Sequence, residues 1–383
     1  MLKYCRHCIM PHSKPDLSFD DSGVCSACSY YENRVTIDWG QRKTDLKLIL
    51  EQYRSSDAKK WDVIIPISGG KDSTYQVIKL LELGVNPLGV VATTCHLSEI
   101  GRKNIQNARE LGIDIYEISS NPKVRRKLNQ IGLTEVGDIS WPEHCSIFTV
   151  PVRIAVQTGV RLIVWGENPQ HEYGGPATNA ESPYLTRRWL EEFGGLMGLR
   201  VTDLIGRSGI QSKDLINYTY PSQEELVSAK ISGLFLGHFL PWDGYTNTLL
   251  AQAYGLTTFE NVVEGSVVNY ENLDNHQTGI HDYFKFLKFG FGRATDIACL
   301  HIRRKRLTRD EGMSIARLHD GRFPWTYLGM PLKEILKPLS MSIEEFIAIC
   351  DKFTNRKLFH CDAKGNLIKD RDGNLTKLHY DND

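Results

Sequence analysis

The stretch PISGGKDSTYQVIKLL, from Pro66 to Leu81, decides the fold and carries the first chemical signal of the sequence. It begins inside an apolar run at 63–67 that predicts a buried strand, and it continues into a run at 73–83 with the spacing of a helix. Between them stand a serine, two glycines, a lysine and an aspartate, and the helical run opens with two further hydroxyl side chains. Backbone N–H groups at the start of a helix bind anions, so this turn predicts a phosphate-binding loop.

Each residue type of the loop suits a triphosphate and its metal ion. The paired glycines let the backbone approach the phosphates closely, and the hydroxyl groups add further donors. Lys71 supplies a point charge, and Asp72 can reach Mg²⁺. A capped helix start would also favour Ser and Asp here, but it would not require both glycines and the lysine. The predicted ATP-binding residues of the loop are Ser68, Gly69, Gly70, Lys71, Asp72, Ser73 and Thr74.

The spacing of the loop excludes two common nucleotide-binding motifs. A Walker A loop needs G-x-x-x-x-G-K-[ST], whereas Ile65 stands five residues before Gly70 and Asp72 follows Lys71. Adjacent glycines also exclude the Rossmann pattern G-x-G-x-x-G. The segment S-G-G-K-D-S resembles instead the PP-loop of the ATP pyrophosphatase superfamily, whose members cleave ATP between the α- and β-phosphates. That resemblance implies AMP and pyrophosphate as products and an adenylate as the intermediate.

Short apolar strands alternate with helices around the loop. Such alternation is typical of an α/β fold with a doubly wound parallel sheet, in which ligands bind beyond the carboxyl ends of the strands. Thr94 and Gly166 fall at such ends and are further predicted ATP-binding residues. The predicted strands are 63–67, 87–94, 113–119 and 160–166, and the predicted helices are 73–83, 99–112 and 146–159.

Three units are expected along the chain. Residues 1–35 form a cysteine-bearing module, 36–230 the α/β domain that binds ATP, and 231–383 a mainly helical part for substrate or partners. The α/β domain begins with an amphipathic helix within 36–60. Near the end, DAKGNLIK is followed by DRDGNLTK, and the two Gly-Asn turns predict a hairpin-like cap.

Composition narrows the class of protein. The 383 residues include 46 basic and 46 acidic side chains, and this zero net charge argues against a protein that grips long nucleic acid. No apolar run approaches the ~20 residues that span a bilayer, and the first ten residues lack the apolar core of a signal peptide. We therefore expect a cytoplasmic protein with neither a nucleic-acid nor a membrane partner.

Four of the nine cysteines form two close pairs near the N-terminus. The spacing Cys5-x2-Cys8 and Cys25-x2-Cys28 supplies four thiolates for a closed, structural Zn²⁺ site. Four ordinary buried cysteines or an iron–sulfur cluster are the alternatives. Zinc would stabilise a module that is too short to build its own core, and four thiolates leave no open position for catalysis.

The segment WGENPQHE, 165–172, follows the last predicted strand of the sheet. It resembles the G-x-x-N-x-x-E stretch by which related ammonia-dependent ligases hold Mg²⁺ and pyrophosphate, but its asparagine stands one place early. Glu167 and Glu172 therefore compete for the metal role, and the predicted Mg²⁺ ligands are Asp72 and Glu172. His171 is a candidate general base. The predicted catalytic residues are Lys71, Asp72, Glu167 and His171.

At the scale of the whole chain the sequence resembles the N-acetyl sugar amidotransferase family of surface-polysaccharide biosynthesis, the WbpG/PseA type. The resemblance rests on YCRHCIMPHSKPDLSFDDSGVCSAC, ISGGKDSTYQ, WGENPQHEYGG and HDYFKFLKFGFGRATDIACLHIRRKRLTRDEG. It implies a PP-loop, Rossmann-like domain of the adenine nucleotide α-hydrolase type, with a zinc-ribbon-like knob and a helical C-terminal part. The implied setting is lipopolysaccharide O-antigen or flagellin-glycan synthesis.

The resemblance also implies a reaction and partners. ATP would adenylate the oxygen of an N-acetyl group on a nucleotide-linked or acidic nonulosonic sugar, and ammonia would convert it to an acetamidino group. The chain has no glutaminase of its own, so a HisH-like glutaminase with a HisF-like barrel subunit is the implied ammonia source. Arginine forks suit the carboxylate and diphosphate of such a sugar, although a solvated basic helix face would look similar. The predicted substrate residues are Arg293, Asp296, Arg303 and Arg304.

A second class of enzyme also combines a zinc module with a PP-loop, namely the enzymes that thiolate tRNA. Those enzymes need a reactive cysteine pair in the nucleotide domain. Cys95 and Cys145 are the candidates here, and neither lies in a C-x-x-C motif. The neutral charge weighs against this alternative as well.

Overall fold

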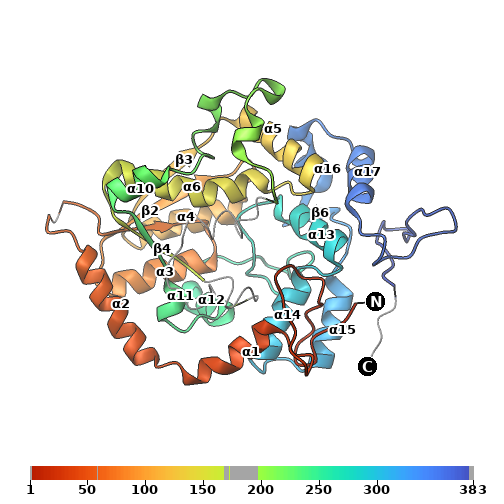
Figure 1. The fold of residues 1–383 in the computed structure, drawn as a ribbon, viewed down its shortest axis with the longest axis horizontal. Coiled ribbons are helices and arrows are strands. Elements are labelled where there is room, and N and C mark those ends of the chain that lie inside the picture. Colours follow the sequence, from red (N-terminus) through yellow and green to blue (C-terminus); the bar gives the residue numbers. More distant parts are fainter. Residues whose placement is uncertain (1, 58, 168–171, 173–196, 379–383) are drawn as a thin grey trace.

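The computed structural model describes residues 2–57, 59–167, 172 and 197–378. Its centre is a five-stranded parallel sheet with the strand order β3-β2-β1-β4-β5 (Figure 1). The strands are β1 (Val63–Pro66), β2 (Pro87–Thr93), β3 (Asp114–Ser119), β4 (Leu162–Trp165) and β5 (Ser232–Phe235). The doubly wound α/β fold expected from the sequence is therefore confirmed.

The strand order places a binding crevice beside the phosphate loop. The chain moves outward from β1 to β2 and β3, then returns to the other side of β1 with β4 and β5. In open parallel sheets the ligand binds at such a reversal, beyond the carboxyl ends of the strands. Here those ends are the ends of β1 and β4. The fifth strand was not predicted, and it carries the sheet past residue 230, where the α/β domain was expected to end.

Helices cover both faces of the sheet because the strands alternate their apolar side chains. Val63 and Ile65 pack on one face with residues of α2 and α3, whereas Ile64 packs on the other with residues of α6. Helix α6 begins at Trp141, before the predicted start at 146, and continues through Pro151, while α5 was not predicted. The helices of this part are α1 (Ser26–Asn33), α2 (Trp39–Tyr53), α3 (Lys71–Glu82), α4 (Glu99–Glu110), α5 (Pro122–Ile131), α6 (Trp141–Thr158) and α10 (Gln223–Ala229).

The C-terminal part is mainly helical, as expected, and has its own aromatic core that includes Phe284, Phe286 and Phe346. A two-stranded hairpin of β6 (Thr326–Tyr327) and β7 (Met330–Pro331) interrupts the helices. Among the described residues, no helix is both long and apolar enough to cross a membrane. The helices are α11 (Leu236–Phe239), α12 (Gly244–Ala253), α13 (Thr278–Phe289), α14 (Arg293–Arg303), α15 (Arg309–His319), α16 (Leu332–Leu336) and α17 (Ile343–Phe353).

Both ends of the chain pack on this helical part. The N-terminal segment lies beside α14 and α15 (Figure 1), where Ile9 and Met10 join one apolar cluster with Ala298 and Ile302. In the tail, the carboxylates of Asp362 and Asp370 accept backbone N–H bonds within successive turns, as the repeat predicted. The cysteine-bearing module therefore docks on the C-terminal helices.

Candidate functional site

The phosphate loop lies between the end of β1 and the start of α3. Gly69 has φ +86°, and a Cβ atom there would stand 2.5 Å from the carbonyl oxygen of Gly101. Only glycine fits that position, because both the backbone conformation and the contact exclude a side chain. The N–H of Gly70 donates to Ser68 Oγ at 3.2 Å, and the hydroxyls of Ser73 and Thr74 donate to the carbonyl of Gly70. The turn is thus held by its own hydroxyl groups.

A cavity of about 320 Å³ opens beside this loop, at the carboxyl ends of β1, β2 and β4. Its polar side includes six of the residues that were predicted from the sequence. Its apolar side is formed by aromatic and aliphatic side chains, as an adenine ring requires. The predicted residues in its wall are Ser68, Asp72, Ser73, Thr94, Gly166 and Glu167, and the apolar ones include Val90, Phe148, Pro151, Trp165 and Phe235.

Lys71 is buried between two carboxylates at the start of α3. Its Nζ lies 2.7 Å from Asp72 Oδ2 and 2.6 Å from Glu271 Oε1, and Asn247 donates to the other oxygen of Asp72 at 3.1 Å. Burial alone would lower the pKa of Lys71, but the charges of Asp72 and Glu271 raise it. The lysine is therefore a permanent cation. Glu271 and Asn247 were not identified from the sequence, because they are 200 and 176 positions away from Lys71 along the chain.

Two further carboxyl groups line the cavity, and both hold their protons unusually tightly. Burial, together with the nearby charge of Asp72, raises the pKa of Glu167 to about 8. Burial raises the pKa of Asp274 to about 6. Among the described residues, Asp274 has no basic partner within salt-bridge distance. Two carboxyl groups with raised pKa values in one nucleotide-sized cavity are typical of a catalytic site.

Asp274 reaches the cavity because its segment of the C-terminal part pairs with the loop that follows β2. Leu97 and Asn275 form an antiparallel bridge, and the N–H of Ser98 donates to the carbonyl of Asp274 at 2.9 Å. Gly101 makes this approach possible, since a Cβ there would lie 2.7 Å from the Cα of Asp274. The C-terminal part thus closes one side of the cavity, which the sequence did not reveal.

The candidate magnesium ligand Glu172 is bound by arginines in this structure. Its two oxygens lie 3.0 Å from Arg34 and 2.7 Å from Arg304, and the side chain is buried. Arg304 also contacts Asp243 at 3.0 Å. The metal role of Glu172 stays a prediction, and His171 lies outside the described residues.

The four predicted substrate residues fall into two groups. Arg303 is buried and donates to the main-chain carbonyls of Cys299 and Glu172, next to Arg304. Arg293 instead lines a second cavity, of about 450 Å³, and makes a two-pronged ion pair with Asp282 at 3.0 and 3.1 Å. Asp296 is paired with Lys285. The substrate role of all four stays a prediction.

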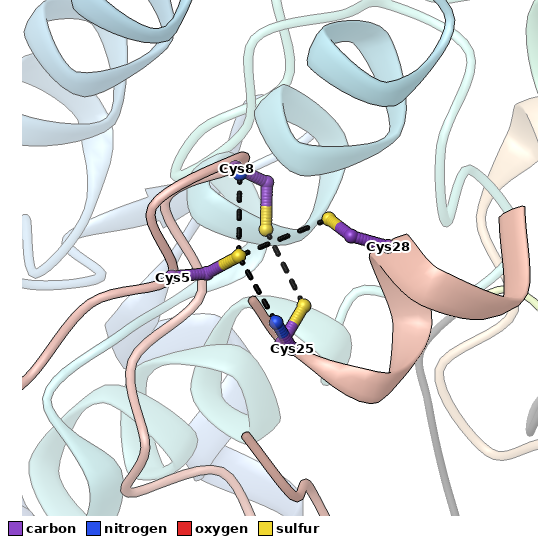
Figure 2. A group of neighbouring side chains, drawn as sticks. All are labelled: Cys5, Cys8, Cys25 and Cys28. Atoms are coloured by element: carbon purple, nitrogen blue, oxygen red, sulfur yellow. Dashed lines mark hydrogen bonds between the residues drawn. The ribbon is translucent and has the colours of Figure 1, made fainter. Parts of the chain in front are cut away.

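The four cysteines of the N-terminal module converge on one point (Figure 2). All four are buried, with Sγ–Sγ distances of 3.9 Å for Cys5–Cys28 and 3.7 Å for Cys8–Cys25. Four sulfurs about 2.3 Å from a tetrahedral Zn²⁺ lie roughly 3.8 Å apart. The N–H groups of Cys8 and Cys25 also point at Cys5 Sγ, at 3.4 and 3.2 Å, which stabilises a thiolate. The residues fit a zinc ion.

Solved structures of two other proteins are similar to part of this chain. An NMN synthetase from Francisella tularensis is similar over 51% of this chain and 92% of its own, with 14% identity and a TM-score of 0.28. A predicted tRNA methyltransferase subunit from Methanocaldococcus jannaschii is similar over 64% of this chain and 89% of its own, with 13% identity and a TM-score of 0.28. No curated protein matches the sequence.

One family model matches the part of the chain that closes the nucleotide cavity. Residues 257–370 match the C-terminal domain of LPS biosynthesis proteins that are WbpG-like. This match includes Glu271, which holds Lys71, and Asp274, which lines the cavity. The matched segment therefore contributes side chains to the same site as the phosphate loop. Over these 114 residues the chain is similar to the C-terminal domain of WbpG-like proteins.

Proposed function

We propose that the protein is an ATP-dependent amidotransferase that turns an N-acetyl group of a sugar into an acetamidino group. The observation that carries the proposal is that two acidic residues of the WbpG-like domain meet the PP-loop: Asp274 lines the cavity beside the loop, and Glu271 forms an ion pair with Lys71. We infer that the PP-loop and the WbpG-like domain act in the same reaction. The PP-loop would favour cleavage of ATP between the α- and β-phosphates. The acceptor would be a nucleotide-linked or nonulosonic N-acetyl sugar.

The reaction has two steps. In the first, the acetamido oxygen attacks the α-phosphorus of ATP, the bond to the bridging oxygen of the β-phosphate breaks, and pyrophosphate leaves. In the second, ammonia attacks the imidate carbon, the carbon–oxygen bond breaks, and AMP leaves with that oxygen. An amide oxygen is a poor leaving group, and adenylation makes it a good one. Water must be kept from the imidate, because hydrolysis would return the starting amide.

The loop residues would bind and orient the triphosphate. The N–H groups from Gly69 to the first turn of α3 form the anion-binding turn, and Lys71 supplies the positive charge. Lys71 is already held by Asp72 and Glu271, so phosphate oxygens would replace carboxylate oxygens around it without exposing it to water. Magnesium would neutralise phosphate charge when bound, and Asp72 and Glu172 are the proposed ligands.

The other predictions from the sequence become parts of this proposal. Zinc bound by the four cysteines would hold the N-terminal module against α14 and α15, and a glutaminase with a cyclase-like barrel subunit would supply ammonia. Residues 1–35, 36–230 and 231–383 are the proposed units, apart from β5, which lies beyond 230 and joins the sheet of the second. Arg293 and Asp296, or Arg303 and Arg304, would bind the charged parts of the sugar.

The tRNA thiolation alternative finds no support in its two cysteines. Burial raises the pKa of the Cys145 thiol, and burial also raises that of Cys95. Sulfur transfer needs a thiolate, so both groups are poorly suited to it at neutral pH.

A panel of acceptors tests the proposal. The protein is incubated with ATP, Mg²⁺ and ¹⁵N-ammonium chloride, together with UDP-N-acetylhexosamines, N-acetylated nonulosonic acids or their CMP derivatives. We expect AMP, pyrophosphate and a sugar in which one oxygen is replaced by ¹⁵NH, measured by mass spectrometry. UDP-glucose, which lacks an N-acetyl group, is the matched control. ADP and phosphate as products would refute the proposal.

A further inference from the structure

Three side chains from distant parts of the chain converge on a buried carboxylate beside α6. Nδ1 of His281 lies 2.8 Å from Oδ1 of Asp138, and Nδ1 of His144 lies 3.2 Å from its Oδ2. The two imidazole rings meet edge to face, with centroids 5.1 Å apart. The N–H of Ser140 also donates to Oδ1 at 2.9 Å. We call Asp138, His144 and His281 the histidine trio.

The local backbone fixes the carboxylate of the trio. A π-helical turn, Gly132–Val136, ends at Gly137 with φ +64°, and the N–H of Asp138 then donates to the carbonyl of Gly132 at 2.9 Å. A Cβ on Gly137 would lie 2.8 Å from the ring of Phe353, so this tight turn requires glycine. Single π-helical turns inside helical segments are frequent at functional sites.

Asp138 is buried, and among the described residues His144 and His281 are the basic side chains within salt-bridge distance of its carboxylate. Other charged groups around the trio are engaged elsewhere: Glu143 with Arg125, Asp282 with Arg293, and Glu135 with Arg207. Lys288 and Lys352 donate to the main-chain carbonyls of Val136 and Thr134. A buried charge is costly unless it is paired, and the ionic partners of Asp138 are these two imidazoles.

The trio stands between the nucleotide cavity and the WbpG-like domain. His144 lies on α6 four residues before Phe148, which lines the cavity, so the two share one face of the helix about 6 Å apart along its axis. His281 comes from α13, inside the matched residues 257–370. A sugar whose acetamido oxygen reaches the α-phosphate would have to lie near this junction.

Asp138 forms a hydrogen-bonded pair with His281 and a close contact with Nδ1 of His144. A carboxylate at Nδ1 favours the tautomer with the proton on Nδ1, which leaves a lone pair on Nε2. The side chains of His144 and His281 are 24% and 27% exposed, so a small molecule can reach them. An imidazole that is held in this way presents Nε2 as its proton-accepting atom.

We propose that His144 and His281, both oriented by Asp138, form the site that takes a proton from the nitrogen nucleophile. The inference rests on the proposed function and identifies the residues that convert ammonium to ammonia. Ammonium gives one proton to Nε2 of a trio histidine, and the ammonia so formed attacks the imidate carbon. The carbon–nitrogen bond forms, the carbon–oxygen bond to AMP breaks, and the imidazolium later releases its proton to water.

The test separates adenylation from amidation. Acceptor-dependent exchange of labelled pyrophosphate into ATP, without ammonium, reports the first step, and ¹⁵N-amidine formation reports the second. For His144→Gln and His281→Gln we expect the exchange to persist, while amidine formation falls about 10²-fold or more at neutral pH. The loss should shrink as pH rises, because free ammonia then becomes abundant. His12→Gln, at an exposed position in the N-terminal module, is the control and should match the wild type.

Three outcomes would overturn the inference. Amidine formation that is unchanged in both variants would remove the proton-accepting role, and an equal loss of pyrophosphate exchange would move the trio to the first step. Two histidines and a carboxylate can also ligate a divalent cation, so a metal beyond one zinc per chain that is lost in His281→Gln would make this a metal site.

A measurement without substrate keeps the inference testable even if no sugar supports exchange, which would count against the proposed function. Ring-¹⁵N NMR of the wild type should show His144 and His281 with the proton on Nδ1 when neutral. Asp138→Asn should shift both rings toward the other tautomer, because the carboxylate that selects the first is gone. Wild-type rings that carry the proton on Nε2 would have no accepting atom and would refute the inference.

Discussion

Replacing Lys71 with methionine tests the arrangement at the centre of the site. The substitution keeps the length of the side chain and removes its charge. The Lys71 and Glu271 side chains are 8% and 9% exposed and 2.6 Å apart, so they form a buried ion pair. Removing one partner of such a pair costs about 3–5 kcal/mol, because the other charge is left buried without compensation.

That loss corresponds to a measurable shift in melting temperature. With an unfolding entropy of about 2.1 cal/mol/K per residue, 383 residues give about 0.8 kcal/mol/K, so Lys71→Met should melt about 4–6 °C below the wild type. The double variant Lys71→Met/Glu271→Gln should recover part of this stability but no activity, since the buried charge of Glu271 is gone and only the more exposed carboxylate of Asp72 has lost its lysine partner. Calorimetry at one scan rate, with zinc content checked in each sample, measures the shift.

A matched control lies on the same helix. Lys79 pairs with Glu82 at 2.9 Å, and the Glu82 side chain is half exposed, so Lys79→Met should cost less than about 1 kcal/mol. Lys71→Met with wild-type stability would refute the buried-pair reasoning. A double variant that still cleaves ATP would refute the role of Lys71 at the phosphates.

Three further changes should have distinct effects. Cys25→Ser should lower zinc, measured by plasma mass spectrometry, from one ion per chain and destabilise the N-terminal module; a wild-type protein with iron instead would contradict the zinc site. Because the pKa of Glu167 is raised from 4.5 to about 8, the folded protein holds a proton that the unfolded chain has lost, so stability falls as pH rises through this window. Glu167→Gln should flatten that fall in melting curves, and an unchanged slope would show that Glu167 is not the group. Gly69→Ala should abolish ATP binding in calorimetric titrations at little cost in zinc, because its Cβ would meet the carbonyl of Gly101; tight binding would refute the geometry of the loop.

Much of the fold could be predicted because its signals are local. The apolar run at 63–67, the glycine pair and the helical spacing after it occupy one continuous stretch, and the structure has β1, the loop and α3 there. The cysteine pairs are equally local, and their spacing was enough to predict the cluster. The strand β5 escaped prediction because four residues with mixed polarity, Ser232–Phe235, carry no periodicity of their own.

The partners of the loop could not be predicted, because tertiary contacts bring them there. Glu271 and Asp274 belong to a segment without regular structure, and its pairing with the loop that holds Leu97 and Ser98 places it at the cavity. Likewise, His281 meets Asp138 across 143 positions of sequence. Residues that meet only in the folded chain show no helical or strand periodicity relative to one another. Their contacts therefore cannot be predicted from one sequence.

The basic run near residue 303 shows the limit of reading charge from sequence. The adjacent arginines have different partners: Arg303 donates to main-chain carbonyls, whereas Arg304 binds Glu172 and Asp243. Neighbouring residues on a helix point about 100° apart, so they need not share a role. Which arginine meets a ligand depends on what the helix packs against.

The path of one oxygen atom tests the central claim most directly. An acceptor labelled with ¹⁸O in its acetamido carbonyl is converted with ATP and ammonium, and the nucleotide product is analysed by mass spectrometry and ³¹P NMR. If that oxygen attacks the α-phosphorus, AMP must carry the ¹⁸O and pyrophosphate must not. Unlabelled AMP, or ADP with phosphate, would contradict adenylation of the acetamido group.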